Sequence, residues 1–131
     1  MTSVPDVDWT ALRAAAAEAA GRSYSPYSGF PVGAAGLLRD GTVLRATNVE
    51  NASYVVGICA ETALVGVLVA GGHGRGDLVA VAVTDPEGTD LSPCGRCRQL
   101  LHEMGGPALP VNERPMATWL PDAFGPEDLE P

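Results

Sequence analysis

Lysine is missing from this sequence: all eight basic residues among its 131 positions are arginines, and they are scattered along the chain. Acidic residues number 16, so the formal net charge is -8 at pH 7. A protein that binds nucleic acid needs a basic surface to neutralise phosphates. The composition therefore argues against a polynucleotide partner and favours a small neutral or cationic ligand, while the acidic surface serves solubility.

Long apolar runs and a secretion signal are missing as well. The sequence contains no stretch of about 20 apolar residues, which is the length that a helix needs to cross a bilayer. The start of the chain, MTSVPDVDW, has neither the basic beginning nor the apolar centre of a signal peptide. We therefore expect a cytoplasmic protein with no membrane partner. Because 46% of the residues are apolar, the chain can build one compact core, and we expect a single domain over residues 1–131.

Cysteine is scarce, with three residues at Cys59, Cys94 and Cys97. An odd number of cysteines in a reducing compartment argues against a disulfide framework, because thiols there stay free. A metal-binding or catalytic role is the stronger interpretation. Cys59 stands two residues before Glu61, and the other two cysteines stand three residues apart in SPCGRCRQ.

Turn signals and apolar periodicity divide the chain into seven elements. We expect helices over residues 8–21, 58–71 and 94–104, and strands over residues 32–38, 42–49, 78–83 and 109–112. Asp8 is a suitable N-cap, and Asp40-Gly41 predicts a hairpin between the first two strands. Strands that alternate with buried helices predict an α/β domain, with the hairpin at one edge and right-handed parallel crossovers on the other side.

The second of these helices is apolar on every face after Thr62. Such a helix must be covered on all sides, and the sheet of a small domain covers one side of it. We therefore expect another subunit to cover the rest, which predicts an oligomer in light scattering.

The cysteines and Glu61 together indicate a zinc site. Cys94 and Cys97, three apart at a helix N-terminus, place their sulfurs on one face, and Cys59 adds a third ligand if the two helix N-termini converge. Three thiolates leave the fourth position of zinc open, which is typical of a catalytic site. Glu61 can act there as a general acid and base if Cys59 belongs to the less regular first turn of its helix.

Other interpretations of these residues stay open at this point. A structural zinc site needs four protein ligands, and the nitrogen candidates, His73 and His102, fall in a Gly-rich turn and late in a helix facing away from Cys94. The thiols could also be buried and inert. On residue type alone, Asn48 and Glu50 are turn residues, and the two phenylalanines belong to the core.

Five motifs, read together, resemble a known family: YSPYSGFPVGAA, TNVENASY, ICAE, PCGRCRQLL and LPDAFGPEDL. They are similar to the small homotetrameric zinc-dependent cytidine deaminases, and a zinc deaminase signature with three cysteines is known. The resemblance runs from about Tyr24 to Leu129. It implies a three-layer α/β/α domain with a mixed sheet of four or five strands, a zinc (Zn²⁺) cofactor and a nucleoside substrate.

The resemblance also implies a role for each matching residue. The zinc ligands are Cys59, Cys94 and Cys97, and the proton shuttle is Glu61. The family mechanism has zinc hydroxide attacking C4 of cytosine while the shuttle protonates N3 and later the departing amine. The implied substrate contacts are Phe30 and Phe124 at the base, Asn48 and Glu50 at the ribose, and Ala60 in the Cys-Ala-Glu motif. In the implied homotetramer, Phe124 reaches a neighbouring active site.

Two departures from the family pattern stand out. An Arg often follows the Cys-Ala-Glu motif and offsets thiolate charge, whereas this chain has Thr62. The acidity of the zinc water therefore depends on whether Arg96 or Arg98 compensates. The stretch from Leu109 to Trp119 is also shorter than the family pattern, so we expect the last strand to be stunted or absent.

The function that follows from the resemblance is hydrolytic deamination of cytidine and deoxycytidine to uridine and deoxyuridine in pyrimidine salvage. One alternative is a deaminase of a cytosine-nucleoside antibiotic such as blasticidin S, to which Gln99 and the NVEN motif fit less well. Another is a catalytically silent structural zinc protein, for which Thr62 is the one supporting feature.

Overall fold

The computed structural model describes residues 6–130. Its elements, in chain order, are α1 (Trp9–Ala20), β1 (Gly33–Leu38), β2 (Val43–Thr47), the 3-10 helix η1 (Tyr54–Val56), α2 (Ala60–Ala70), β3 (Leu78–Thr84), α3 (Gly95–Gly105), β4 (Pro110–Val111), β5 (Arg114–Pro115), α4 (Met116–Trp119) and the 3-10 helix η2 (Pro126–Asp128). All seven predicted elements are present, and their boundaries differ from the predicted ones by at most two residues.

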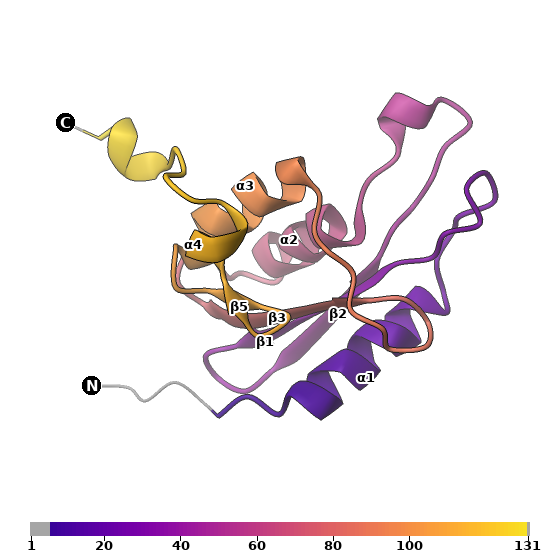
Figure 1. Ribbon diagram of the computed structural model, residues 1–131, viewed down its shortest axis with the longest axis horizontal. Helices are drawn as coiled ribbons and strands as arrows, with labels where there is room; N and C mark the ends of the chain where they lie inside the picture. Colours follow the sequence, from indigo (N-terminus) through magenta and orange to yellow (C-terminus); the bar gives the residue numbers. More distant parts are fainter. Residues whose placement is uncertain (1–5, 131) are drawn as a thin grey trace.

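The five strands form one mixed sheet in the order β2-β1-β3-β4-β5. β1 pairs antiparallel with both β2 and β3, β3 pairs parallel with β4, and β4 pairs antiparallel with β5. Helix α1 covers one face of the sheet, and α2 and α3 cover the other (Figure 1). The predicted three-layer α/β/α architecture with a mixed sheet is therefore confirmed, and the sheet has five strands.

The central strands β1 and β3 are buried along their whole length, because each is covered on both faces. Asp8 caps α1 as predicted, since its carboxylate accepts a hydrogen bond from the Ala11 amide. Helix α1 lies very close to β1 at Gly33, where a Cβ atom would stand 1.8 Å from the carbonyl oxygen of Ala16. Glycine is thus required at Gly33 by close packing of two backbones.

Two hydrophobic clusters fill the two interfaces of the sheet. One joins α1 to the sheet and includes Leu12 and Leu37. The larger one joins α2 and α3 to the sheet and includes Leu64, Leu68 and Leu101. It fixes the two helices whose first residues belong to the cysteine motifs.

The C-terminal end of the sheet is stunted, as predicted. β4 has two residues, and the turn that follows it uses Asn112 and Glu113 with positive φ angles of 49° and 66°. β5 and the one-turn helix α4 were not predicted. Two-residue strands and a single helical turn are too short to carry a periodic pattern.

The apolar face of α2 is partly uncovered in the single chain. Leu64 and Leu68 are fully buried, whereas Val67 and Val69 are 42% and 53% exposed. From residue 6 to 130, no helix has both the length and the apolar character needed to cross a bilayer.

Candidate active site

The three cysteines meet where α2 and α3 begin. Cys59 and Cys94 are the N-cap residues of these helices, and both have extended backbone conformations. Their sulfurs lie 3.9 Å apart, and with the Cys97 sulfur they form a group of potential ligand atoms within 4.8 Å of one another. Neither His73 nor His102 belongs to this group. As an N-cap, Cys59 lies outside the regular helix, which is the condition under which Glu61 can share its pocket.

The sulfur positions fit zinc. Tetrahedral zinc with Zn–S bonds of about 2.3 Å separates its sulfur ligands by about 3.8 Å, close to the spacing of Cys59 and Cys94. Helix N-termini also favour thiolate, since their free N–H groups and positive dipole ends face the sulfurs. The Cys97 amide points at the Cys94 sulfur, 3.5 Å away.

Two of the three thiols of this cluster, Cys59 and Cys97, resist ionisation. Burial, followed by the charge of Cys94, raises the pKa of Cys59. Burial also raises the pKa of Cys97, with the Glu61 carboxylate adding to the effect. Burial acts to raise the pKa of Cys94 too, but hydrogen bonds from the Cys97 amide and neighbouring thiols outweigh it, so this pKa lies below its ordinary value. Three thiolates therefore need a cation to hold them in the charged form.

Uncharged and charged neighbours of the cysteines have different roles. The Thr62 hydroxyl lies 3.7 Å from the Cys97 sulfur, within reach of a hydrogen bond. Arg98, one of the two arginines considered as charge compensators, uses its guanidinium elsewhere: it donates to the carbonyls of Pro93 and Trp119, each at 2.8 Å. Arg96 is exposed. Thr62 is thus the residue next to the motif that contacts a thiol directly.

A pocket of about 430 Å³ opens beside the cysteines, within the size range of small-molecule sites. It is lined by Ser28, Phe30, Val32, Asn48, Val49, Glu50, Tyr54, Gly57, Ile58, Cys59, Ala60, Glu61, Val83, Leu91, Ser92 and Cys94. Glu61 is 4% exposed, and burial raises the pKa of its carboxyl. Ala60 is fully buried at the start of α2. A buried carboxyl therefore shares one pocket with two of the cysteines.

The two residues of the NVEN motif have different surroundings. The Asn48 amide is engaged within the protein, because its oxygen accepts from the Val32 amide at 3.0 Å and its nitrogen donates to the Phe30 carbonyl at 3.1 Å. The Glu50 side chain is half-buried, and its carboxylate accepts hydrogen bonds from the amides of Tyr27 and Ser28 and from the Ser28 hydroxyl. The Ser28 hydroxyl and amide hold the pKa of Glu50 below its usual value.

The two phenylalanines lie in different places. Phe30 lines the pocket and is 56% exposed, so its ring has room to contact a ligand. Phe124 is 58% exposed and does not line this pocket. The structure thus brings Phe30, Asn48, Glu50, Ala60 and Glu61 to one pocket within the chain and leaves Phe124 outside it.

Several pocket residues were not singled out from the sequence. Ser28 belongs to the hydroxyl-rich loop before Phe30, and that enrichment was a usable signal. Val83, Leu91 and Ser92 form the wall next to Cys94. They lie at a strand end and in a loop, and no residue type or spacing distinguishes them.

Comparison with known proteins agrees with this geometry. The family described as "Cytidine and deoxycytidylate deaminase zinc-binding region" matches residues 8–112. The chain is 52% identical to cytidine deaminase of Mycobacterium tuberculosis strain H37Rv over 96% of each chain, and 42% identical to that of Halalkalibacterium halodurans over 82% and 86%.

Solved structures agree in fold over most of the chain. The crystal structure of cytidine deaminase from Mycobacterium tuberculosis has a TM-score of 0.85, with 49% identity, and covers 92% of this chain and 99% of its own. That from Mycobacterium leprae has a TM-score of 0.83, with 50% identity, and covers 89% and 100%. The chain therefore belongs to the cytidine and deoxycytidylate deaminase family of zinc-binding proteins.

Proposed function

We propose that this protein is a zinc-dependent deaminase that converts cytidine to uridine and deoxycytidine to deoxyuridine, as a step of pyrimidine salvage. One observation carries the proposal: the buried Glu61 carboxyl lines the same pocket as Cys59 and Cys94, two of the three clustered cysteines, and Cys97 completes the sulfur cluster from the buried side. Three protein ligands leave one position for water or substrate, as in catalytic zinc sites. The cytidine deaminases that match nearly the whole chain support the choice of substrate.

The reaction adds water to C4 of the cytosine ring and releases ammonia. Zinc, when bound, supplies the positive charge that makes water reactive near neutral pH. In our proposal Glu61 takes one proton from the attacking water and gives it to ring N3. It then moves the second proton from the new hydroxyl to the amino group, the C4–N bond breaks, and ammonia leaves. A raised pKa suits this task, because a shuttle must both accept and release protons.

The ribose contacts follow from which hydrogen-bonding groups are free. Glu50 lines the pocket, and its carboxylate accepts three hydrogen bonds from Tyr27 and Ser28. A carboxylate has about four acceptor positions, so it can also accept a hydrogen bond from a sugar hydroxyl. The side-chain oxygen of Asn48 already accepts from the Val32 amide, and one N–H of its side-chain nitrogen donates to the Phe30 carbonyl. The second N–H of this nitrogen is left for the substrate. Ala60 contributes the close approach of its backbone at the start of α2. Phe30 packs against the base, where an apolar wall holds a flat ring.

We also propose that the protein forms a homotetramer in which Phe124 completes the pocket of a neighbouring subunit. Phe124 is exposed and outside its own pocket. The exposed apolar residues Val67 and Val69 of α2, and Tyr54 and Val55 of η1, need a cover. A second copy of the chain meets both requirements. Light scattering tests this part separately, and a monomer at assay concentration would contradict it.

Activity is tested with zinc-loaded protein and cytidine. We expect a loss of ultraviolet absorbance and one ammonia released per cytidine consumed. Removal of zinc by a chelator should stop the reaction, and added zinc should restore it. Zinc-loaded protein that leaves cytidine and deoxycytidine unchanged would contradict the proposal, and turnover of blasticidin S alone would reassign the substrate. The cytoplasmic location and the single domain over residues 1–131 stay predictions.

A further inference from the structure

The loop of residues 85–93 connects β3 to Cys94 and forms one wall of the pocket. Leu91 and Ser92 of this loop line the pocket together with Val83 at the end of β3. The loop folds back on the strand it leaves, because the Leu91 amide donates to the Val83 carbonyl at 2.9 Å. Leu91 is three residues before Cys94, so its position sets where the chain enters the zinc site.

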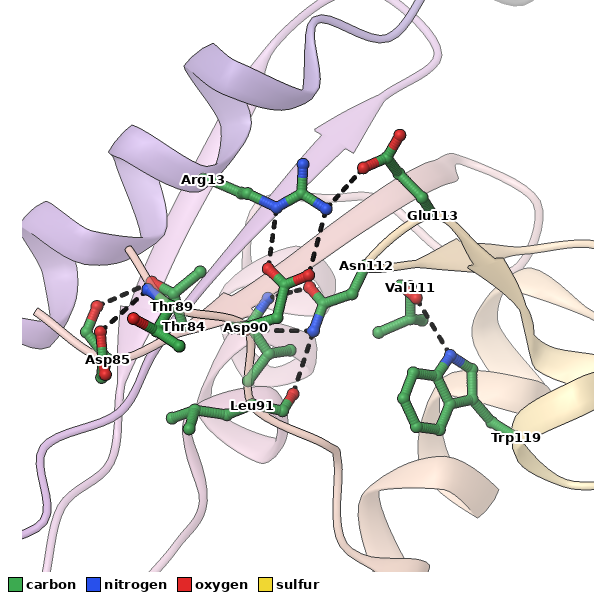
Figure 2. Close-up of polar contacts among 11 residues, drawn as sticks. Arg13, Thr84, Asp85, Thr89, Asp90, Leu91, Val111, Asn112, Glu113 and Trp119 are labelled. Carbon is green, nitrogen blue, oxygen red and sulfur yellow. Dashed lines mark hydrogen bonds and ion pairs between the residues drawn. The ribbon is translucent and has the colours of Figure 1, made fainter. Parts of the chain in front are cut away.

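A single buried side chain, that of Asn112, also joins this loop to β3. Asn112, the first residue of the turn after β4, is 7% exposed. Its side-chain oxygen accepts from the Val83 amide at 2.9 Å, and its side-chain nitrogen donates to the Val83 carbonyl at 3.2 Å. The same nitrogen donates to the Leu91 carbonyl at 3.0 Å (Figure 2). The side-chain oxygen and both N–H groups of this carboxamide thus have partners, all in the backbone.

This arrangement compensates for the shortness of β4. The strand ends at Val111, so Val83 of β3 has no following β4 residue to pair with. The Asn112 carboxamide supplies the missing donor and acceptor, as a peptide group of a longer strand would. Its backbone φ of 49° is left-handed, a region that asparagine adopts more readily than most residues. Aspartate at this position would lack the donors, and glycine would lack the whole amide.

We infer that Asn112 is a positioning residue for the zinc site: its carboxamide holds Leu91 at the end of β3 and thereby fixes the approach of the chain to Cys94. Leu91 also lines the pocket, so one side chain outside the cavity determines a wall and a ligand. The inference rests on the proposed zinc-dependent activity, although its main readout is the retention of the metal.

A second tie joins the same two segments at the surface. The Arg13 guanidinium from α1 bonds both carboxylate oxygens of Asp90, at 2.8 and 3.2 Å, and Glu113, at 2.6 Å (Figure 2). Asp90 and Glu113 are the neighbours of Leu91 and Asn112. This ion pair is partly exposed, and exposed pairs stabilise little. Substitution of Glu113 in this exposed ion pair is therefore a suitable comparison for substitution of the buried Asn112.

Loss of the carboxamide leaves buried groups of the Val83 and Leu91 backbones without partners. Such groups are costly to bury, so the loop must shift or admit water. Mutation of a residue that orients a metal ligand typically lowers metal affinity or activity by about 10- to 100-fold. The ribose side of the pocket is built from Glu50 and the Ser28 loop, which Asn112 does not contact, so substrate binding should change little.

The test compares zinc-loaded parent protein with Asn112→Gly and Asn112→Asp. We expect zinc to pass to a chelating dye about tenfold faster in both variants, and kcat for cytidine to fall while KM stays near the parent value. Glu113→Gly, in the same turn, and Leu12→Ala, in the core under α1, are the controls. Leu12→Ala should lose stability and Glu113→Gly should change it little, and neither should release zinc faster.

Three results would overturn the inference. One is zinc release and kcat in Asn112→Gly that match Leu12→Ala when both are assayed equally far below their Tm. A second is an equal acceleration of zinc release by Glu113→Gly. The third is failure of both Asn112 variants to fold while Leu12→Ala folds, because Asn112 would then serve the whole fold. If the parent protein retains zinc but does not deaminate cytidine, the proposed function fails while zinc release still tests Asn112.

Discussion

The side-chain amide of Gln99 donates a 2.6 Å hydrogen bond to the backbone carbonyl of Phe124. Gln99 lies on α3, two residues after Cys97, so the helix that carries two cysteines also holds the segment that carries the exposed phenylalanine. The next residue, Gly125, donates its amide to the Asp128 carboxylate of η2. Phe124 is therefore presented outward from a fixed backbone.

Phe124→Ala should raise KM for cytidine about five- to tenfold and leave kcat nearly unchanged, because an aromatic contact of about 1–1.5 kcal/mol would be lost. Gln99→Ala should shift KM in the same direction by a smaller factor, since the ring remains but its backbone loosens. Steady-state kinetics measure both. A parent-like KM for Phe124→Ala would mean that this ring completes no pocket.

Glu61→Gln should retain zinc at the parent stoichiometry and reduce turnover at least about 100-fold, because the amide keeps the shape of the side chain but cannot shuttle protons. Metal analysis and a cytidine assay on the same sample separate the two effects. Glu103→Gln, an exposed acid later on α3, is the matched control and should be fully active. Turnover that survived in Glu61→Gln would assign the proton transfers to another group.

The sulfur cluster could be predicted from the sequence because its determinants are local. The spacing of Cys94 and Cys97, and a helix start at Cys59, follow from a few neighbouring residues. The clamp of Asn112 on Leu91 and that of Arg98 on Trp119 join residues 21 positions apart. Around Asn112 a strand over residues 109–112 was predicted, but the two-residue β5 and the one-turn α4 are too short to carry a periodic pattern, so their pairing was not. Long-range pairing between short elements was the part that the sequence did not reveal.

Thr62→Val should weaken the hold on zinc without changing the fold, because it removes the hydroxyl near the Cys97 sulfur but keeps the branched shape. A hydrogen bond worth about 1 kcal/mol corresponds to about fivefold faster zinc release. Thr62→Ser retains the hydroxyl and should behave as the parent protein does. Equal release rates for the Val and Ser variants would show that the hydroxyl does not support the ligand.

Glu50 predicts a pH-dependent contribution to stability. Its folded pKa lies below the unfolded value of 4.5, chiefly because of the Ser28 hydroxyl. A lowered folded pKa means that the stabilisation is fully present above pH 4.5 and is lost as pH falls through the folded pKa. The Tm of Glu50→Gln should therefore lie below that of the parent at pH 6–7, and the gap should close in acid. The two proteins differ in no other titratable group. A difference in Tm that stays constant as the pH falls would therefore exclude ionisation of Glu50 as its source.

Gly33→Ala tests the contact that seats α1 on the sheet. The new Cβ would stand 1.8 Å from the Ala16 carbonyl oxygen and 2.6 Å from the Ala20 amide nitrogen, and because these are backbone atoms the whole helix must move. Overpacking of this kind costs about 1–3 kcal/mol or more, so Tm should fall by roughly 5 °C or more.

Gly74→Ala is the control for this substitution, since its Cβ meets no atom within 4 Å. Helix α1 lies on the face of the sheet opposite α2 and α3 (Figure 1). The Gly33→Ala protein should therefore keep the parent KM and zinc release rate well below its Tm, although it melts earlier. Faster zinc release at that temperature would mean that strain at α1 reaches the cysteines through β1 and β3, and that the two faces of the sheet are coupled.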